Sequence, residues 1–433
     1  MTPQLSSSAK ESLQAVLDKQ AGYLGGAFLS VATSEGVIFN SCSGLFDQLE
    51  RGKQDARKAS TSDVMWYAST TKLIIAAAYL QLVDRGTLTL DTDMTQFDQR
   101  LKKAASQRLV TFVDGKPIYE PNEVPIRLRD MLNNTSGFAA EMGPLYQQWR
   151  ALPDSPKGFV LGCKLDSLVH KPITETPGTM FEYGNSADWL GLILPAITKE
   201  PVEDYLRRNI LDPLGMSDTT FFPFEWTDRL MPLRYARGSE KGGEVVWEEL
   251  TDQLPLLTIP RRKEDIEYCV GGGGIYSNTG DYIKLLHHLL VQRLFLLGQV
   301  PKKSSVTILS DESIKSLFKP SLPDSALPGM AAMLNRWFMQ TDQEGLLEAG
   351  DANWGTAVAM YTPRDGRPRG GFGRKPNTIG WGGAAGTEFW IDPSAGIAVV
   401  WTTQQLPGAG NPTVLQAKKD IERAVYQAFG MDQ

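Results

Sequence analysis

Short apolar runs near both ends of the chain predict β-strands. Residues 26–33 (GAFLSVAT) and 37–46 form two such runs, joined by a Ser-Glu-Gly turn. Three more strand-like runs, at residues 357–361, 388–391 and 397–403, lie near the C-terminus. Two strands do not make a stable sheet by themselves. We therefore expect the N-terminal pair to join the C-terminal three in one antiparallel sheet.

Helical patterns flank these strands and fill the middle of the chain. Residues 1–20 and 413–429 each have the spacing of an amphipathic helix. The clearest helical patterns of the interior cover residues 188–198, 202–210 and 281–297. Residues 97–122 are polar and show neither the helical nor the strand periodicity of apolar residues, so we expect an irregular surface segment there.

These patterns predict an α+β fold with two domains. Residues 1–95 and 275–433 would form a discontinuous domain, an antiparallel sheet flanked by helices, and residues 96–274 a mostly helical second domain. A cleft between two such units is a natural place for a substrate.

One apolar helix carries a candidate nucleophile at its start. Ser69 precedes Lys72 by three residues, immediately before the run from Leu73 to Ala78. On a helix, side chains at this spacing share a face. A lysine partly shielded by that apolar run can act as the base that activates a serine. The helix N-terminus also stabilises negative charge.

The spacing alone does not identify the nucleophile. The same Ser-x-x-Lys motif occurs at Ser7/Lys10, near the N-terminus, and at Ser316/Lys319, at the end of a polar helix. The alternative for Ser69 is a helix-capping serine beside a solvated lysine.

The scarcity of histidine favours a serine enzyme with a lysine base. The chain contains only His170, His287 and His288, and it has no Gly-x-Ser-x-Gly nucleophile elbow. Paired cysteines or a two-histidine helical motif, which a zinc site would need, are also missing from the sequence. We therefore predict no metal and no cofactor.

Composition narrows the class of partner and the compartment. A net charge of −6 gives no field that favours nucleic acid or an anionic membrane. No apolar stretch is long enough to span a bilayer, and the first residues do not form a signal peptide. Three widely spaced cysteines are typical of a reducing compartment, so we expect a cytoplasmic protein with no disulfide framework.

A second motif supplies a further base. Tyr183 and Asn185 frame a glycine in the middle segment. A tyrosine beside the Lys72 ammonium loses its proton more easily and can share the base role. Asn185 can hold Lys72 and a substrate oxygen together. Tyr276, in a similar Tyr-Ser-Asn sequence, is the other candidate for this role. The alternative for either tyrosine is an ordinary amphipathic aromatic.

A glycine-rich run near the C-terminus completes the candidate site. It leads into the strand near residue 389, and small residues let the backbone approach a ligand closely. The N–H groups of Ala384 and Ser69 would form an oxyanion hole. The residues predicted to bind substrate are Asn185, Trp381, Gly382, Gly383 and Trp390.

The order of these motifs resembles the serine β-lactamase and penicillin-binding-protein superfamily. The tyrosine variant is similar to class C β-lactamases and family VIII carboxylesterases, and the chain looks most like the fungal lovastatin-type acyltransferases. By that resemblance Ser69 is the nucleophile, Lys72 and Tyr183 form the base system, and the Ser69 and Ala384 amides bind the oxyanion. It implies a β-lactamase/transpeptidase-like fold.

The third motif departs from that of true β-lactamases. Their Lys-Thr-Gly lysine, which holds the antibiotic carboxylate, is replaced here by Trp381. We therefore predict a serine acyltransferase that moves an acyl group from an ester or thioester donor to the hydroxyl of a small natural product. The alternatives are a carboxylesterase, a catalytically inactive ligand-binding member of the fold and, more weakly, a β-lactamase.

A basic stretch raises the question of a protein partner. Residues 364–375 contain four arginines and a lysine against a single aspartate. Such a stretch can dock an acidic acyl-carrier protein or a coenzyme A phosphate, although it is more often a solvated loop.

Overall fold

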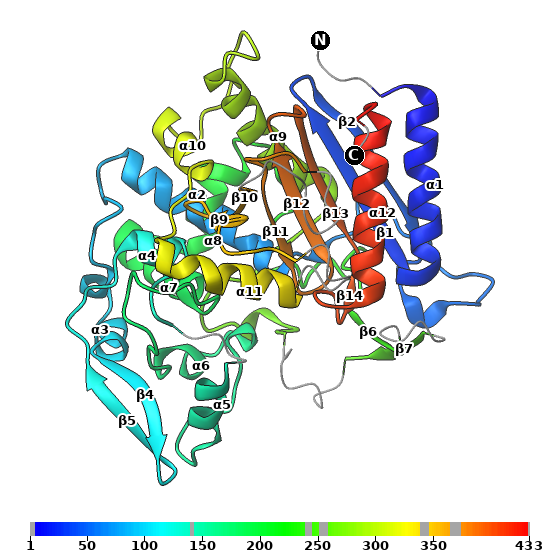
Figure 1. Ribbon diagram of the computed structural model, residues 1–433. Coiled ribbons are helices and arrows are strands. Elements are labelled where there is room, and N and C mark those ends of the chain that lie inside the picture. The colour runs from blue at the N-terminus through cyan, green and yellow to red at the C-terminus, as the bar shows by residue number, and fades with distance from the viewer. Residues whose placement is uncertain are drawn as a thin grey trace.

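A seven-stranded antiparallel sheet forms the centre of the molecule (Figure 1). The computed structural model describes residues 5–138, 143–238, 245–250, 259–337, 346–363 and 374–431. The sheet order is β2-β1-β13-β12-β11-β10-β9. Its strands are β1 (Gly26–Thr33), β2 (Gly36–Gly44), β9 (Ala352–Trp354), β10 (Ala359–Tyr361), β11 (Ile379–Gly383), β12 (Thr387–Asp392) and β13 (Ile397–Thr402). The predicted union of N-terminal and C-terminal strands is confirmed.

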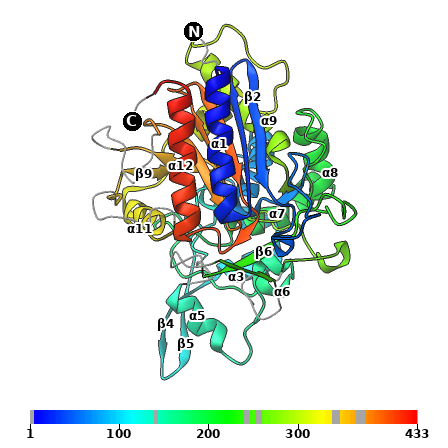
Figure 2. The same cartoon turned by 90° about the vertical axis from the view of Figure 1, so that its right-hand side faces the viewer.

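The two terminal helices cover one face of this sheet (Figure 2). Helices α1 (Ser7–Leu24) and α12 (Pro412–Ala428) lie side by side. Their buried residues, such as Leu17 and Ile421, pack with Trp390 and Val399 from the strands. Side chains alternate along a strand, so every second residue of the central strands faces this layer.

The opposite face packs on α9 (Thr279–Leu296), and α2 (Thr71–Asp84) lies in the same hydrophobic core. Helix α2 is buried on nearly every side, as expected of a helix that is apolar all round. Asn278 caps α9, because its side chain accepts the Asp281 N–H.

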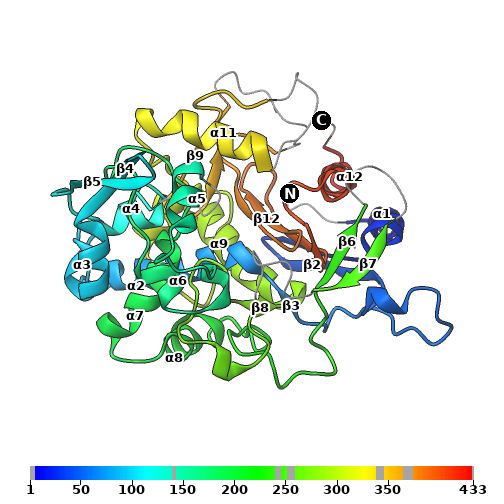
Figure 3. The same cartoon turned by 90° about the horizontal axis from the view of Figure 1, so that it is seen from below.

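The middle segment is mostly helical, and its helices lie on the side of the molecule away from α1 and α12 (Figure 3). Its helices are α3 (Gln99–Ala105), α4 (Leu128–Leu132), α5 (Pro144–Ala151), α6 (Asp166–Val169), α7 (Ser186–Thr198) and α8 (Val202–Leu206). The division into domains at residues 95/96 and 274/275 stays a prediction.

The expectation of irregular structure at residues 97–122 is wrong. This segment forms α3 and a hairpin of β4 (Gln107–Val113) and β5 (Lys116–Pro121). Asp98 caps α3 by accepting two backbone N–H groups. The hairpin turns at Asp114 and Gly115, with φ of 50° and 74°, the conformation that an Asp-Gly pair favours.

Small elements complete the described chain. They are β3 (Met65–Trp66), β6 (Arg234–Arg237), β7 (Val246–Glu249), β8 (Tyr276–Ser277), β14 (Gln405–Leu406), α10 (Asp311–Leu317) and α11 (Leu327–Trp337). Among the helices that the structure describes, none combines the length and apolar character that a bilayer crossing requires.

Candidate active site

Ser69 lies in a tight turn between β3 and α2. The turn, Ala68–Thr70, leaves Ser69 half-buried. Ala68 has a φ of 45°, a conformation that costs energy for any residue with a Cβ. Backbone strain of this kind is commonly found at functional sites, where the surrounding structure holds it.

A glycine run, residues 271–274, supports the Ser69 turn from the other side. The Trp66 indole donates to the Gly273 carbonyl at 2.6 Å, and the Tyr67 N–H donates to the Ile275 carbonyl at 2.9 Å. The Ile275 N–H in turn donates to the Thr71 hydroxyl at 3.0 Å. The turn is therefore fixed by a segment that is distant in sequence.

Lys72 is buried beside Tyr183, as the motifs predict. Its side chain is 8% exposed, and Nζ lies 4.7 Å from the centre of the Tyr183 ring. The same ammonium donates a hydrogen bond to the Gly272 carbonyl at 2.7 Å. The glycine run thus holds the lysine as well as the serine turn, which sequence reasoning did not foresee.

Trp381 contacts the tyrosine directly. Its indole Nε1–H donates to the Tyr183 hydroxyl oxygen at 2.9 Å, and the two ring centres are 5.0 Å apart. A hydrogen bond donated to a phenol oxygen stabilises its deprotonated form. Tyr183 therefore has a cation over its ring and a neutral donor on its oxygen, both of which suit a base.

The end of β11 abuts the Ser69 turn. A Cβ on Gly383 would lie 2.7 Å from the Tyr67 carbonyl oxygen and 3.2 Å from Ala68 Cβ, so only glycine fits. This contact brings Ala384 next to Ser69. Among the described residues, the Ala384 carbonyl accepts from Gly408, and no backbone hydrogen bond uses the Ala384 N–H. That N–H is thus available for an oxyanion.

Asn185 has different partners from those expected. Its Oδ1 accepts from Lys171 at 2.6 Å, and its Nδ2 donates to Asp188 at 2.8 Å. The amide is therefore committed to buried neighbours and not to Lys72. Burial raises the pKa of Asp188, against the opposing effects of Lys72, Asn185, Gly272 and Lys171. An aspartate within the apolar pattern of α7 was the sequence signal for this group.

Trp390 does not reach the site. It is fully buried on the sheet face that packs against α1 and α12, where Arg374 stacks on its ring at 4.7 Å. Trp381 and its pair partner Phe389 point to the opposite face. A shift of one residue along a strand changes the face, which is why neighbouring aromatics have different surroundings.

A cleft of about 980 Å³ lies beside the Ser69 turn. Trp66, Tyr276 and Ala68 belong to one apolar cluster, against which Ile259 and Ala384 pack. Trp66 thus links the cleft to the turn through this cluster, whereas Ser69, Lys72, Tyr183 and Ala384 are not among the residues that line the cleft. Its apolar lining includes Trp66, Phe159, Phe224, Leu233, Ile259 and Tyr276. Tyr276, the rival base, is thus a wall residue.

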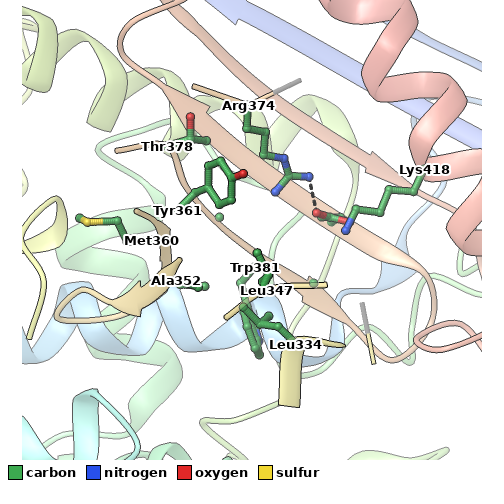
Figure 4. A pocket seen from close by; sticks show the side chains of 13 residues that line it. Leu334, Leu347, Ala352, Met360, Tyr361, Arg374, Thr378, Trp381 and Lys418 are labelled. Atoms are coloured by element: carbon green, nitrogen blue, oxygen red, sulfur yellow. Dashed lines mark hydrogen bonds and ion pairs between the residues drawn. The ribbon is translucent and has the colours of Figure 1, made fainter. Parts of the chain in front are cut away.

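A second, smaller cavity of about 60 Å³ lies at β10 and β11 (Figure 4). Leu334, Leu347 and Trp381 line its apolar side, and Arg374 and Lys418 its charged side. Arg374 is buried and paired with glutamates, so it is not a docking residue as the basic stretch suggested. Lys375 is half-buried, and residues 364–373 of that stretch lie outside the described residues.

Thiol and metal chemistry find little support in the described chain. Burial raises the pKa of Cys42 to about 11 and that of Cys163 to about 12, which disfavours the nucleophilic thiolate. Within the described residues, no group of three or more His, Cys, Asp or Glu side chains could hold a metal ion.

Comparisons with known proteins show the family and the fold of the chain. Residues 13–421 match the family model described as Beta-lactamase. A lovastatin esterase of Penicillium rubens is 26% identical over 426 residues, 96% of this chain and 97% of its own. Acyltransferase calJ of Penicillium decumbens is 27% identical and covers 83% of this chain and 80% of its own. Simvastatin synthase (LovD) of Aspergillus terreus superposes with a TM-score of 0.79 at 21% identity, covering 99% of this chain and 100% of that one.

Proposed function

The chain belongs to the beta-lactamase family, and from that premise we propose that it is a serine acyltransferase with Ser69 as nucleophile. The observation that carries the proposal is the convergence of three distant segments. Lys72 Nζ lies against the Tyr183 ring, Tyr183 accepts from Trp381, and Gly383 sits against the Ser69 turn. The names of the relatives, an esterase and an acyltransferase, describe the same class of reaction.

In the first half-reaction, Ser69 Oγ attacks the carbonyl carbon of an ester or thioester. Its proton passes to the Tyr183–Lys72 base, and the negative oxygen rests on the Ser69 and Ala384 N–H groups. The bond from the acyl carbon to the leaving group then breaks. The leaving alcohol or thiol takes the proton, and an acyl-Ser69 ester remains.

In the second half-reaction, an acceptor hydroxyl reverses these steps. The base takes the hydroxyl proton, the acceptor oxygen bonds to the acyl carbon, and Ser69 leaves with a proton returned by the base. Water in place of the acceptor gives hydrolysis. The apolar wall of the large cleft suits an organic acceptor, whereas the similarity to a lovastatin esterase favours the second candidate, a carboxylesterase.

Trp381 argues against a β-lactam substrate. Its indole is 4% exposed and is used by Tyr183, so it offers no cation to a substrate carboxylate. We therefore propose a small-molecule ester or thioester donor and a small alcohol acceptor. An acyl-carrier protein as donor and a cytoplasmic location remain parts of this proposal.

Replacing Ser69 tests the function. The wild type incubated with p-nitrophenyl butyrate should gain one butyryl group by intact mass spectrometry, and Ser69→Ala should gain none and lose turnover. Ser316→Ala is the matched control, because Ser316 has the same spacing to a lysine but bonds within α10. Turnover retained by Ser69→Ala would refute the proposal. The ratio of butyl butyrate to butyrate in the presence of butanol then separates transfer from hydrolysis.

A further inference from the structure

A chain of buried polar groups connects Lys72 to a second lysine. Lys171 Nζ donates to Asn185 Oδ1 at 2.6 Å, and Asn185 Nδ2 donates to Asp188 Oδ2 at 2.8 Å. Asp188 Oδ1 accepts from the Gly272 N–H at 2.8 Å, and the Gly272 carbonyl accepts from Lys72 Nζ at 2.7 Å. Lys171 is 2% exposed and Asp188 is 4% exposed. Two ammonium groups are thus each connected to one buried carboxylate through a single intervening residue, Asn185 for Lys171 and Gly272 for Lys72.

Gly272 marks how closely Asp188 and Lys72 approach. A Cβ on Gly272 would lie 2.4 Å from Asp188 Oδ1 and 3.1 Å from Lys72 Nζ. The two charged atoms therefore flank one small space that no side chain occupies. Charges at such short range interact strongly in a buried site, where water screens them little.

Close backbone packing brings Asp188 to this position. A Cβ on Gly271 would lie 2.1 Å from the Ala187 carbonyl oxygen, and one on Gly191 would lie 2.3 Å from the Cys269 carbonyl oxygen. Helix α7 can approach the glycine run only because both positions lack side chains. The glycines of residues 271 and 272 therefore place an aspartate beside the catalytic lysine.

We infer that Asp188 is a positioning residue for Lys72. We also infer that Lys171 weakens the electrostatic stabilisation that Asp188 gives to the Lys72 ammonium. Asp188 keeps the ammonium at the Gly272 carbonyl and the Tyr183 ring. Lys171, through Asn185, draws on the same carboxylate and so makes proton release from Lys72 easier. This inference rests on the proposed function, since it concerns the base for Ser69.

The charged groups near this chain define the expected effects. Asp188 and Tyr183 face Lys72, and Cys163 and Lys171 face Asp188. Loss of the Lys171 charge in Lys171→Met favours the protonated base, so the acid limb of the kcat/KM profile should move up by about one pH unit. Asp188→Asn removes the negative charge, so the same limb should move down while kcat falls at least about tenfold.

The experiment is a pH profile of p-nitrophenyl butyrate turnover from about pH 5 to about pH 10. Lys171→Arg, which keeps the charge, should restore the wild-type profile, and Lys315→Met is the control for loss of an exposed lysine. Opposite shifts in Lys171→Met and Asp188→Asn support the inference. Wild-type profiles in both variants, or a shift in the same direction, would overturn it.

Gly272→Ala is an independent test of the geometry. Its methyl group would enter the space between Asp188 and Lys72, so kcat should fall at least about tenfold while thermal unfolding confirms a folded protein. A folded Gly272→Ala enzyme with wild-type kcat would contradict the inference. If the wild type itself forms no acyl-enzyme, the proposed function fails instead, and the two failures are thereby distinguished.

Discussion

At the scale of single residues, Trp381 determines much of the chemistry that the site can perform. Its indole donates to the Tyr183 oxygen at 2.9 Å and packs edge-to-face against Trp354, with ring centres 4.6 Å apart. A neutral donor stabilises a phenolate without adding a full positive charge. The tyrosine is therefore supported as a base, while the substrate side of the site gains no cation for a carboxylate.

Trp381→Phe should lower kcat with little change in KM. The variant keeps an aromatic ring but removes the donor to Tyr183, a loss of about 1 to 1.5 kcal/mol that corresponds to about tenfold in rate. Steady-state kinetics with p-nitrophenyl butyrate would measure it. A change confined to KM would mean that Trp381 only shapes the pocket.

Trp354→Phe is the matched control for that experiment. Trp354 is fully buried next to Trp381, but its indole donates to the Leu132 carbonyl at 3.1 Å. Its replacement removes a buried hydrogen bond of the same kind but keeps the hydrogen bond to Tyr183, and a phenylalanine keeps an aromatic ring where Trp354 packs on Tyr183, with ring centres 6.3 Å apart. We expect a lower melting temperature and a kcat within about twofold of the wild type.

Sequence motifs predicted only part of the residue-level site. Ser69 and Lys72 were recognisable because they lie three residues apart at the start of an apolar run, and Tyr183 because it stands in a Tyr-Gly-Asn motif. Gly272 acts through its carbonyl and its missing side chain, and neither leaves a functional signal in a sequence. Lys171 was invisible for another reason, since its role depends on a contact with Asn185 that only the folded chain creates.

At the scale of elements, a buried ion cluster ties β12 to α12. Glu388 on β12 bonds to Arg374 and, at 2.9 Å, to Lys418, while Arg374 reaches Glu422 at 3.1 Å. Burial acts to raise the pKa of Glu388, but Lys418 and Arg374 outweigh it and hold that pKa below its usual value. For Glu422, burial prevails and raises the pKa. Glu388 is therefore the carboxylate on which both cations depend.

Glu388→Gln should destabilise the fold strongly. It would remove the charge of the carboxylate that pairs with both Arg374 and Lys418 in the core, and breaking a buried pair in this way costs about 3–5 kcal/mol. Urea unfolding would measure the change. Glu312→Gln makes the same substitution in an exposed pair with Lys315, where we expect less than about 1 kcal/mol. Equal losses in the two variants would contradict a special role for the cluster.

Two elements show where sequence patterns misled at this scale. The hairpin of β4 and β5 was missed although its Asp-Gly turn was visible, because the polar composition of residues 97–122 concealed the strands. The residues of β11 were expected to form a glycine-rich loop before β12, since glycine favours neither strands nor helices. A Cβ on Gly380 would lie 2.5 Å from the Phe389 carbonyl oxygen, so close strand packing requires this glycine.

At the scale of the whole molecule, the site exists only when distant segments meet. Ser69 follows β3, Tyr183 precedes α7 in the helical middle segment, and Ala384 follows β11 near the C-terminus. The sheet could be predicted from alternation at the two ends of the chain. Its register could not, because which residues of β11 and β12 pair depends on the packing of both faces.

Acid should destabilise the whole fold through α9. Burial, with a smaller contribution from His287, lowers the pKa of His288 from 6.5 to about 4. The unfolded chain binds this proton below about pH 6.5, whereas the folded chain does so only below about pH 4. Stability from neutral His288 is therefore complete above pH 6.5 and is lost as the pH falls towards 4, by roughly 3 kcal/mol at most.

Urea unfolding at about pH 7.5 and about pH 4 would measure this loss, which His288→Gln should reduce by up to about 3 kcal/mol. Within the described residues, neither ring nitrogen of His288 has a hydrogen-bond partner, so protonation gains no compensating contact. His170→Gln removes an exposed histidine and should leave the acid loss as it is in the wild type. If the acid loss is the same in His288→Gln and the wild type, then other groups drive acid unfolding, and the burial of His288 has no measurable effect on it.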